Sequence, residues 1–340
     1  MDSLTQIVLG SACGEAVLGK KIGNKALLFG GIAGTIPDLD VFVGRLLYDN
    51  EIQAMAFHRG IMHSIFFAVF ASLLLGWLVH WIFNRKKRFG KVNLKDWILL
   101  FFWAIFTHPI LDCFTAYGTQ LFAPFSNYRV AFDNISVVDP FYTLPFLMCL
   151  LVLMFFKRSS RVRFLILKLG FGFSTIYMFL TFVNKSYVNT VFKSSLKTQA
   201  IEYHRFRCQP TILNNILWYG IAESDTHYFL ALYSIFDKSK TPKKWHKIAK
   251  NHHLFPIQDQ DIQTLIWFSN GFYSISPTDK NKEYIFKDLR YPLLDEDDSN
   301  SSIFSFSIKK KAERWIALPL STRELDGKDL EKFWNRVKGI

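Results

Sequence analysis

The stretch Trp97–Thr119 reads "WILLFFWAIFTHPILDCFTAYGT" and joins an apolar run to two ionisable side chains. Eleven residues without a charge precede His108, and Asp112 follows before the chain turns polar. Ionisable side chains at membrane depth are costly, so they usually face a protein interior or a water-filled cavity and serve a function. The stretch therefore predicts a membrane helix with functional groups at one end.

Apolar residues are concentrated in the first half of the chain. Of 340 residues 50% are apolar, Phe alone occurs 35 times, and the mean hydropathy is +0.13. Long apolar runs dominate up to about residue 184, and no later window approaches the roughly 18 apolar residues that a membrane span needs. We therefore predict an α-helical integral membrane domain over residues 1–184 and a soluble α+β domain over residues 185–340.

The membrane domain is predicted to contain six segments. Four are full spans, at about residues 61–83, 97–114, 138–156 and 164–183. Two shorter helices precede them, at about residues 4–19 and 26–43, and "TIPDLD" interrupts the second. Both are rich in glycine, and small residues let membrane helices pack closely.

The second domain shows strand and helix patterns. Aromatic and β-branched segments bounded by turn signals predict strands in "HYFLALYSIF" (227–236), "TLIWFSNGFYSI" (264–275), "KEYIFKDLRYP" (282–292) and "SIFSFSIKKK" (302–311). Helices are predicted in "TPKKWHKIAKNHH" (241–253) and in "STRELDGKDLEKFWNRVKG" (321–339), with Thr322 as N-cap. The acidic segment 294–302 is predicted to be a loop, because its spacing does not match a calcium-binding EF-hand.

Charge and cysteine usage exclude several classes of protein. The net charge of +13 is shared by both halves, which argues against a single nucleic-acid-binding patch. The four cysteines have no paired spacing, so neither a disulfide framework nor a cysteine-type zinc site is expected. The expected partner is the lipid bilayer, and no nucleic-acid partner is expected.

Basic loops predict the topology. The loop 84–95 carries six Lys or Arg residues and the loop 157–163 carries four, so both should be cytoplasmic. Lys20, Lys21 and Lys25 place the first short turn on the same side. The connections 44–60 and 115–137 and everything after residue 184 are then extracytoplasmic. The polar motifs of the membrane domain fall near the outer ends of their spans, which predicts one cluster: Asp38, Asp40, His58, His63, His108, Asp112 and Asp139.

The motif "HPILD" suits a metal ion. His108 and Asp112 are four residues apart, so on a helix they lie on one face, one turn apart. Imidazole nitrogen and carboxylate oxygen are both ligands of zinc and similar divalent metals. Pro109 would sit in the first turn of the helix that carries Asp112, or kink a longer one. The alternative is a hydrogen-bonded pair that holds two helices together.

The motif "HRGIMHS" supplies two more histidines. His58 and His63 are not on one helical face, so His58 should precede the helix that carries His63, with Gly60 allowing a tight approach. Arg59 is always charged, and its fork suits carboxylate or phosphate. The alternative is that His58 and Arg59 only anchor the chain at the membrane interface.

The motif "IPDLD" adds Asp38 and Asp40, which point the same way only if the backbone is extended. A turn that ends a helix is the alternative. Asp139 precedes Pro140, where an N-cap of the next span is equally compatible.

These groups can form one metal site or a close pair. The predicted metal ligands are His58, His63, His108, Asp112 and Asp40. A metal lowers the pKa of water for attack on an ester or phosphoester, and Asp38 or Asp139 could act as general base. The expected cofactor is one or two divalent ions, zinc first.

The motifs "HRGIMHS", "HPILDCFTAYGT", "IPDLD" and "VVDPFYTLP", in this order and spacing, resemble the YdjM family of membrane-bound, metal-dependent hydrolases. The resemblance covers about residues 1–156. It implies that His58, His63, His108 and Asp112, with the aspartates of "IPDLD", form the metal site. The start "MDSLTQ" departs from the family pattern, because Gln6 stands where members often carry a histidine.

The predicted function is metal-dependent hydrolysis at the outer face of a bacterial inner membrane, on a lipid, a phospholipid headgroup or a lipid-linked intermediate, and Arg59 favours a phosphoester among these. Asp38, Asp139 and Arg59 are the predicted catalytic residues. The alternatives are a transporter or metal-handling protein, and an anchor for an extracytoplasmic binding domain.

Overall fold

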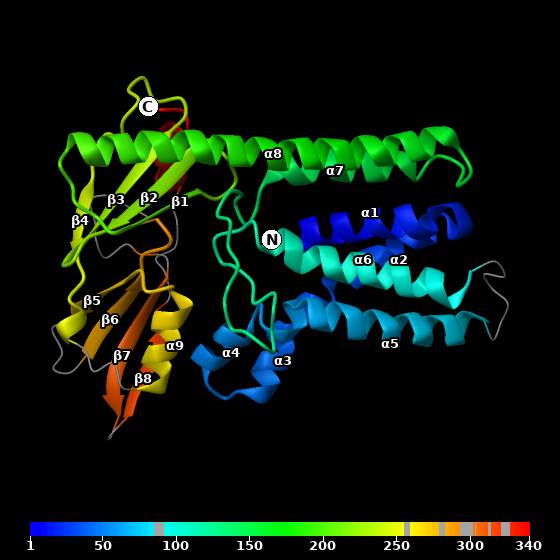
Figure 1. Cartoon of the computed structure of the whole chain (residues 1–340), viewed down its shortest axis with the longest axis horizontal. Helices are drawn as coiled ribbons and strands as arrows, with labels where there is room; N and C mark the ends of the chain where they lie inside the picture. Colours follow the sequence, from blue (N-terminus) through cyan, green and yellow to red (C-terminus); the bar gives the residue numbers. More distant parts are fainter. Residues whose placement is uncertain are drawn as a thin grey trace. The chain divides into compact units, whose positions relative to one another are not determined.

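The computed structural model describes residues 1–84, 92–254, 259–278, 283–292, 302, 304–311, 314–320 and 327–340. It divides into two compact units, whose elements are labelled in Figure 1. The first, here the membrane unit, comprises Met1–Gly44, Phe57–Phe182 and Ile212–Asn214. The second, here the C-terminal unit, comprises Arg45–Ala56, Val183–Thr211 and Asn215–Ile340. The predicted fold class, membrane helices followed by a soluble α+β part, is confirmed.

The helices of the membrane unit identify a multi-pass membrane protein. Four helical stretches are long and apolar enough to cross a bilayer: Asn24–Leu47, Ile65–Phe83, Leu94–Asp112 and Arg161–Thr198. The first of these contains α2 (Asn24–Thr35), the 3-10 turn η1 (Pro37–Leu39) and α3 (Asp40–Leu47), and the others are α5 (Ile65–Asn84), α6 (Leu94–Asp112) and α8 (Arg161–Thr198). Two further helices are α1 (Ser3–Ile22) and α7 (Pro140–Leu153).

Three segments differ in length from their predictions. The stretch predicted as a full span at 138–156 forms only the 14 residues of α7, because Asp139 caps the helix and Pro140 starts it. The segment predicted as short at 26–43 is helical from Asn24 to Leu47 apart from its 3-10 turn. The helix α8 continues to Thr198, beyond the predicted span end at residue 183, so the border between the compact units lies inside this helix. The domain boundary at residue 184 stays a prediction.

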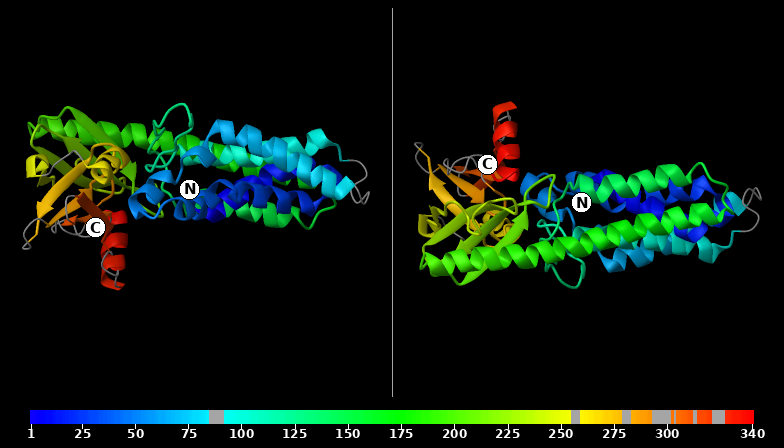
Figure 2. Two further views of the ribbon diagram at one scale, coloured as in Figure 1. Left: turned by 90° about the horizontal axis from the view of Figure 1, so that it is seen from below. Right: turned by 90° about the horizontal axis from the view of Figure 1, so that it is seen from above.

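Glycines set the packing of α1 against α2, which lie side by side in Figure 2. A Cβ atom at Gly10 would collide with the backbone of Gly30, and one at Gly34 would lie 2.6 Å from the carbonyl oxygen of Gln6. Large side chains of α6 and α7, among them Trp97, Leu100 and Phe146, fill the core of the unit. The close approach confirms the role predicted for the small residues.

A buried ion pair joins α1 to α8. Arg163 donates from Nε and Nη2 to the two carboxylate oxygens of Glu15, both at 2.6 Å. The two side chains are 3% and 5% exposed. Arg163 also donates to the side chain of Asn24 and to the carbonyl oxygens of Leu153 and Phe156. The pair is therefore fully hydrogen-bonded, as a buried charge requires.

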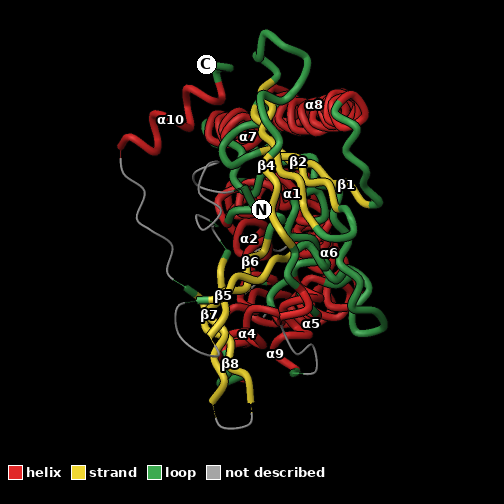
Figure 3. The backbone as a smooth tube through the Cα atoms, turned by 90° about the vertical axis from the view of Figure 1, so that its left-hand side faces the viewer, coloured by secondary structure: helices red, strands yellow, loops and turns green. Residues whose placement is uncertain are grey.

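The C-terminal unit contains two antiparallel sheets of four strands, drawn in yellow in Figure 3. The first has the order β1 (Arg205–Pro210), β2 (Leu217–Glu223), β3 (His227–Ser234) and β4 (His246–Ala249). The second has the order β5 (Tyr273–Pro277), β6 (Glu283–Asp288), β7 (Ser305–Lys311) and β8 (Arg314–Pro319). Helix α9 (Gln260–Phe268) contributes Ile262 and Leu265 to the core of the second sheet, and α4 (Glu51–Phe57) contributes Ile52. The last helix is α10 (Gly327–Val337).

Two predictions in this unit are wrong. The segment 241–253, predicted as a helix, forms β4 and a 3-10 turn at His252–Leu254, because pairing with β3 overrides helix propensity. The segment 264–275, predicted as one strand, ends α9 and begins β5. Ile262, Leu265 and Phe268 are spaced for one buried helix face, and Asp259 caps that helix. The predicted cap Thr322 and the loop residues 294–301 lie outside the described residues.

Candidate metal centre

Two buried imidazoles face each other at the centre of the site. His108 belongs to the last turns of α6, and His63 ends the 3-10 turn η2 (Ile61–His63) just before α5. Their Nε2 atoms are 3.1 Å apart, and both side chains are at most 1% exposed. On the far side of each ring, Nδ1 of His108 lies 2.6 Å from the carbonyl oxygen of Gly34, and Nδ1 of His63 lies 2.9 Å from Oδ2 of Asp40.

Two carboxylates complete the group. Oδ1 of Asp38 lies 3.4 Å from Nε2 of both His63 and His108, and Oδ2 of Asp112 lies 3.5 Å from the same two atoms. Four ligands of a tetrahedral zinc ion, each about 2.0–2.1 Å from the metal, are roughly 3.3 Å from one another. The three distances among Asp38, His63 and His108 lie between 3.1 and 3.4 Å and match that spacing, and Oδ2 of Asp112 approaches both imidazoles of this group at 3.5 Å.

The protonation of the rings makes the centre suitable for a cation. Nδ1 of His108 has the Gly34 carbonyl oxygen as a hydrogen-bond partner, whereas Nδ1 of His63 lies beside the Asp40 carboxylate outside hydrogen-bond geometry. Because each Nδ1 atom has an oxygen as its neighbour, we assign the proton of each neutral ring to Nδ1. Both Nε2 atoms then present lone pairs toward each other and toward two carboxylate oxygens. Oδ2 of Asp112 is buried without a hydrogen bond. Converging acceptors of this kind are the donor set that a divalent metal needs, so these residues fit such an ion.

Asp40 and His58 form a second group that shares His63. Oδ1 of Asp40 lies 2.8 Å from Nδ1 of His58, and Oδ2 accepts from the backbone N–H of Arg59 at 2.9 Å. Burial lowers the pKa of His58, and the Asp40 carboxylate opposes that shift only in part. His58 is 25% exposed whereas Asp40 is fully buried. The three residues Asp40, His58 and His63 can also hold a metal ion.

The backbone of "IPDLD" is not extended as predicted. Pro37–Leu39 forms a 3-10 turn, and Asp40 starts α3. The two aspartates still meet at one residue, because Asp38 approaches Nε2 of His63 while Asp40 approaches Nδ1 of the same ring. A turned backbone thus brings them to opposite edges of one imidazole.

Arg59 lies beside the cluster in a left-handed backbone conformation, with φ +60°. Its Nη1 donates to Thr115 at 2.8 Å, and its Nε lies 3.3 Å from Oδ2 of Asp112, outside hydrogen-bond geometry. The backbone N–H of Gln120 donates to the carbonyl oxygen of Arg59 at 3.0 Å. A non-glycine residue held in this way is characteristic of functional sites.

The carboxylate of Asp139 contacts residues outside the cluster. It caps α7, accepting from the backbone N–H groups of Phe141 and Tyr142, and also accepts from the Tyr177 hydroxyl at 2.9 Å. Burial raises the pKa of Asp139. These contacts match the N-cap alternative, whereas Asp38, the other predicted base, lies with His63 and His108 in a group that could hold a metal ion.

Gln6 is a site residue that sequence reasoning did not assign. Its Nε2 donates to Oδ1 of Asp112 at 3.0 Å and to the carbonyl oxygen of His108 at 3.3 Å, and the side chain is 1% exposed. The amino group of Met1 contacts the same Oδ1. The sequence contained a sign that Gln6 belongs to the site, because Gln6 stands at the position where the resembled family often carries a histidine.

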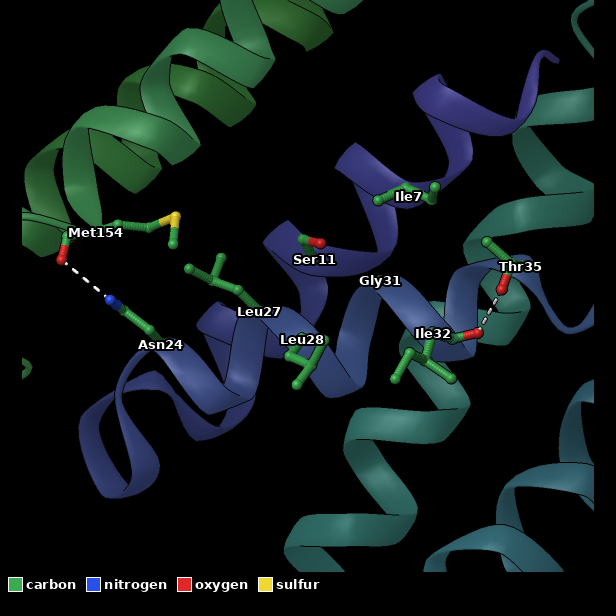
Figure 4. A pocket seen from close by; sticks show the side chains of 9 residues that line it. All are labelled: Ile7, Ser11, Asn24, Leu27, Leu28, Gly31, Ile32, Thr35 and Met154. Carbon is green, nitrogen blue, oxygen red and sulfur yellow. Dashed lines mark hydrogen bonds between the residues drawn. The ribbon is translucent and has the colours of Figure 1, made fainter.

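A groove on α1 and α2 lies apart from this chemistry. Figure 4 shows its lining, which includes Ile7, Ser11, Gly31 and Met154 and none of the cluster residues. The Asn24 amide donates to the Met154 carbonyl oxygen at 3.1 Å at one end of it. The groove thus carries none of the ionisable groups that converge in the cluster.

Comparison with known proteins covers mainly the membrane unit. The family model described as YdjM inner membrane protein matches residues 1–188. A protein of Bacillus subtilis (strain 168), described as "Uncharacterized protein YfhP", is 34% identical over 148 residues. The match spans 42% of this chain and 42% of that relative. No solved structure matches the chain.

Proposed function

The chain belongs to the YdjM family of inner membrane proteins, and on that premise we propose that it is a membrane hydrolase dependent on one divalent metal ion. The proposed ligands are Asp38, His63, His108 and Asp112, and the proposed metal is zinc. The observation that carries the proposal is the convergence of Asp38, His63 and His108, whose ligand atoms lie 3.1–3.4 Å from one another, with Oδ2 of Asp112 at 3.5 Å from both imidazole Nε2 atoms.

One ion is proposed rather than two because His63 belongs to both candidate groups. A neutral imidazole has one lone pair on nitrogen and binds one metal. Filling both groups would require the ring to lose its second proton. We therefore assign Asp40 the supporting role, in which its carboxylate fixes the ring of His63, as outer carboxylates do for metal-binding histidines.

The ion, when bound, would supply a Lewis acid and make water more acidic. Residues of the chain would hold the ligand rings and orient the substrate. The Gly34 carbonyl oxygen holds the His108 ring by its Nδ1 atom, and the Asp40 carboxylate lies 2.9 Å from Nδ1 of His63. Arg59 would orient an anionic substrate beside the ligand Asp112. This revises the expected role of Asp38 from general base to ligand.

We assign the proton-accepting role to His58. Its Nδ1 contacts Asp40, an arrangement that orients an imidazole for proton transfer, and it is the most exposed histidine of the cluster. Burial keeps its pKa low, so the ring is neutral near pH 7 and able to take up a proton. Asp139, occupied as a helix cap, is not needed for this step.

The predicted topology completes the proposal. The cluster and the C-terminal unit would be extracytoplasmic, with the loops 84–95 and 157–163 in the cytoplasm. The substrate would be a lipid or another phosphoester that reaches the site at the membrane surface.

The direct test is hydrolysis by the full chain, purified in detergent and loaded with zinc. Phosphomonoester, phosphodiester and carboxylic-ester lipids would be offered, beside the His63→Ala and His58→Ala variants. We expect turnover of one ester class, lost with bound zinc in His63→Ala and lost with zinc retained in His58→Ala. Turnover that is equal in the wild type and in His63→Ala would refute a role for the cluster.

A further inference from the structure

Two arginines contact one tyrosine beside the cluster. The guanidinium carbons of Arg59 and Arg129 lie 4.8 and 4.9 Å from the ring centroid of Tyr117. The ring of His58 lies 5.6 Å from the same centroid. Arginine stacks on aromatic rings favourably. One ring therefore holds two positive charges close to the proposed metal ligands.

Arg59 has hydrogen-bonding capacity left after its contacts with the protein. Its Nη1 donates to Thr115, and its Nε lacks a hydrogen bond. Its Nη2 has no hydrogen bond to any residue in the described ranges, although the residue is only 4% exposed. A nearly buried guanidinium with N–H groups left over is placed to bind an anion.

Contacts with the backbone position the side chain of Arg129. Its Nη2 donates to the carbonyl oxygen of His58 at 3.0 Å. The next residue, Val130, pairs with Thr119 in an isolated antiparallel bridge, which fixes the loop that carries both Tyr117 and Arg129. The same loop bonds to the His58–Arg59 segment at two successive carbonyl oxygens. The three side chains thus form one preorganised group.

With a metal bound, the aspartates of the cluster and the two arginines have a net positive charge, which favours binding of an anion. Asp38, Asp40 and Asp112 carry three negative charges against two on Arg59 and Arg129. A divalent cation would leave this set with one positive charge and neutral imidazoles. A phosphate group carries up to two negative charges and has the oxygen geometry that the planar fork of arginine binds in pairs.

We propose that Arg59, Arg129 and Tyr117 form a binding site for the phosphate group of the substrate. The proposal rests on the proposed hydrolase function and narrows its substrate to phosphate esters. Arg59 would connect this site to the metal centre, because its Nε lies 3.3 Å from Oδ2 of Asp112. Tyr117 would act by positioning the two guanidinium groups.

Inorganic phosphate is the first probe. Its binding to the zinc-loaded full chain would be measured by titration calorimetry in the wild type, Arg129→Gln, Tyr117→Leu and Tyr117→Phe. We expect Arg129→Gln and Tyr117→Leu to raise the Kd at least about tenfold, and Tyr117→Phe, which keeps the ring, to change it less than about twofold. Arg158→Gln removes the same charge where the side chain only bonds the Lys21 carbonyl oxygen, and should leave the Kd unchanged.

A second arm distinguishes a lipid headgroup from free phosphate. The same proteins would be placed in nanodiscs of a phosphate-free glycolipid, with and without phosphatidic acid, and their thermal unfolding compared. Stabilisation by phosphatidic acid that is lost in Arg129→Gln would identify a lipid source, and calorimetric binding alone would identify a soluble one. Unchanged binding in Arg129→Gln and Tyr117→Leu in both arms would overturn the proposal.

Zinc content and ester turnover distinguish failure of the phosphate-binding site from failure of the proposed hydrolase function. Retained zinc in Arg129→Gln shows that the variant still folds at the cluster. Arginine-dependent phosphate binding without turnover of any ester would leave the anion site standing and refute the hydrolase. Turnover of phosphate esters that is unchanged in Arg129→Gln and Tyr117→Leu would support the hydrolase and refute the anion site.

Discussion

The Nε2 atoms of His63 and His108 lie 3.1 Å apart, and each is 3.4 Å from the same carboxylate oxygen of Asp38. His108 belongs to α6 and His63 to the turn before α5, and the opposite nitrogens lie 2.6 Å from the Gly34 carbonyl oxygen and 2.9 Å from the Asp40 carboxylate. This leaves two explanations for the facing nitrogens. Either a metal ion lies between them, or a proton on one ring makes a purely structural hydrogen bond.

Removing one ring separates these explanations. His108→Ala should abolish near-stoichiometric zinc, because it deletes one of four ligands from a buried site. Elemental analysis of protein purified in detergent, before and after chelator treatment, measures the loss. His253→Ala removes an exposed histidine of the C-terminal unit and should leave the zinc content unchanged. Absence of metal from the wild type after soaking in zinc would favour the structural hydrogen bond.

Asp38 and Asp139 should respond differently to the same substitution. Asp38→Ala should deplete zinc. Asp139→Ala should retain zinc and instead destabilise the protein by about 1 kcal/mol, the usual cost of losing a helix N-cap. Zinc content and the free energy of unfolding, measured on both variants, test the two roles. Zinc loss in Asp139→Ala alone would reverse our assignment.

Asp40→Asn should weaken metal binding without abolishing it. Loss of the carboxylate charge beside Nδ1 of His63 leaves the ligands in place but less well oriented, which typically costs about 10- to 100-fold in metal affinity. Competition with a zinc-binding dye gives the Kd directly. An unchanged affinity would show that Asp40 supports only His58 and the Arg59 backbone.

Glu15→Gln should destabilise the membrane unit strongly. It leaves Arg163 buried without its carboxylate partner, and breaking a buried pair in this way costs about 3–5 kcal/mol. The double variant Glu15→Leu/Arg163→Met removes both charges and should be less destabilised than Glu15→Gln. Thermal unfolding in one detergent compares the three proteins. If Glu15→Gln were as stable as the wild type, water would have access to the buried pair.

Topology is open to a direct measurement. A reporter fused after Ile340 that works only outside the cytoplasm should be active, and one fused within loop 84–95 should be inactive. The expected pattern follows from the basic loops at 84–95 and 157–163. A C-terminal fusion active only in the cytoplasm would reverse the orientation and place the cluster at the inner face.

Much of the membrane unit was predictable because apolar length and glycine content are local signals. The shared face of His108 and Asp112 followed from helical spacing alone, and the structure has them on one continuous helix with Pro109 inside it. The joint approach of Asp38 and Asp40 to His63 depends on a 3-10 turn, which spacing cannot distinguish from an extended segment.

Other features depend on contacts between distant residues. The Gly34 carbonyl oxygen that holds His108 lies 74 residues away in the chain, and no side-chain pattern marks a backbone acceptor. The strand β4 carries the composition of a basic helix, and only its pairing with β3 makes it a strand. Arg129 belongs to a loop without periodicity, so its approach to Tyr117 had no signal in the sequence.

Gln6 has a further consequence for the choice of ion. Its amide engages Oδ1 of Asp112, which leaves only Oδ2 directed toward the two imidazoles. Asp112 is thereby restricted to monodentate coordination, and the coordination number of the centre stays low. Calcium takes six to eight oxygen ligands and uses bidentate carboxylates, whereas zinc is satisfied by four ligands. In the proposed one-ion centre, this hydrogen bond from α1 would therefore favour zinc over calcium.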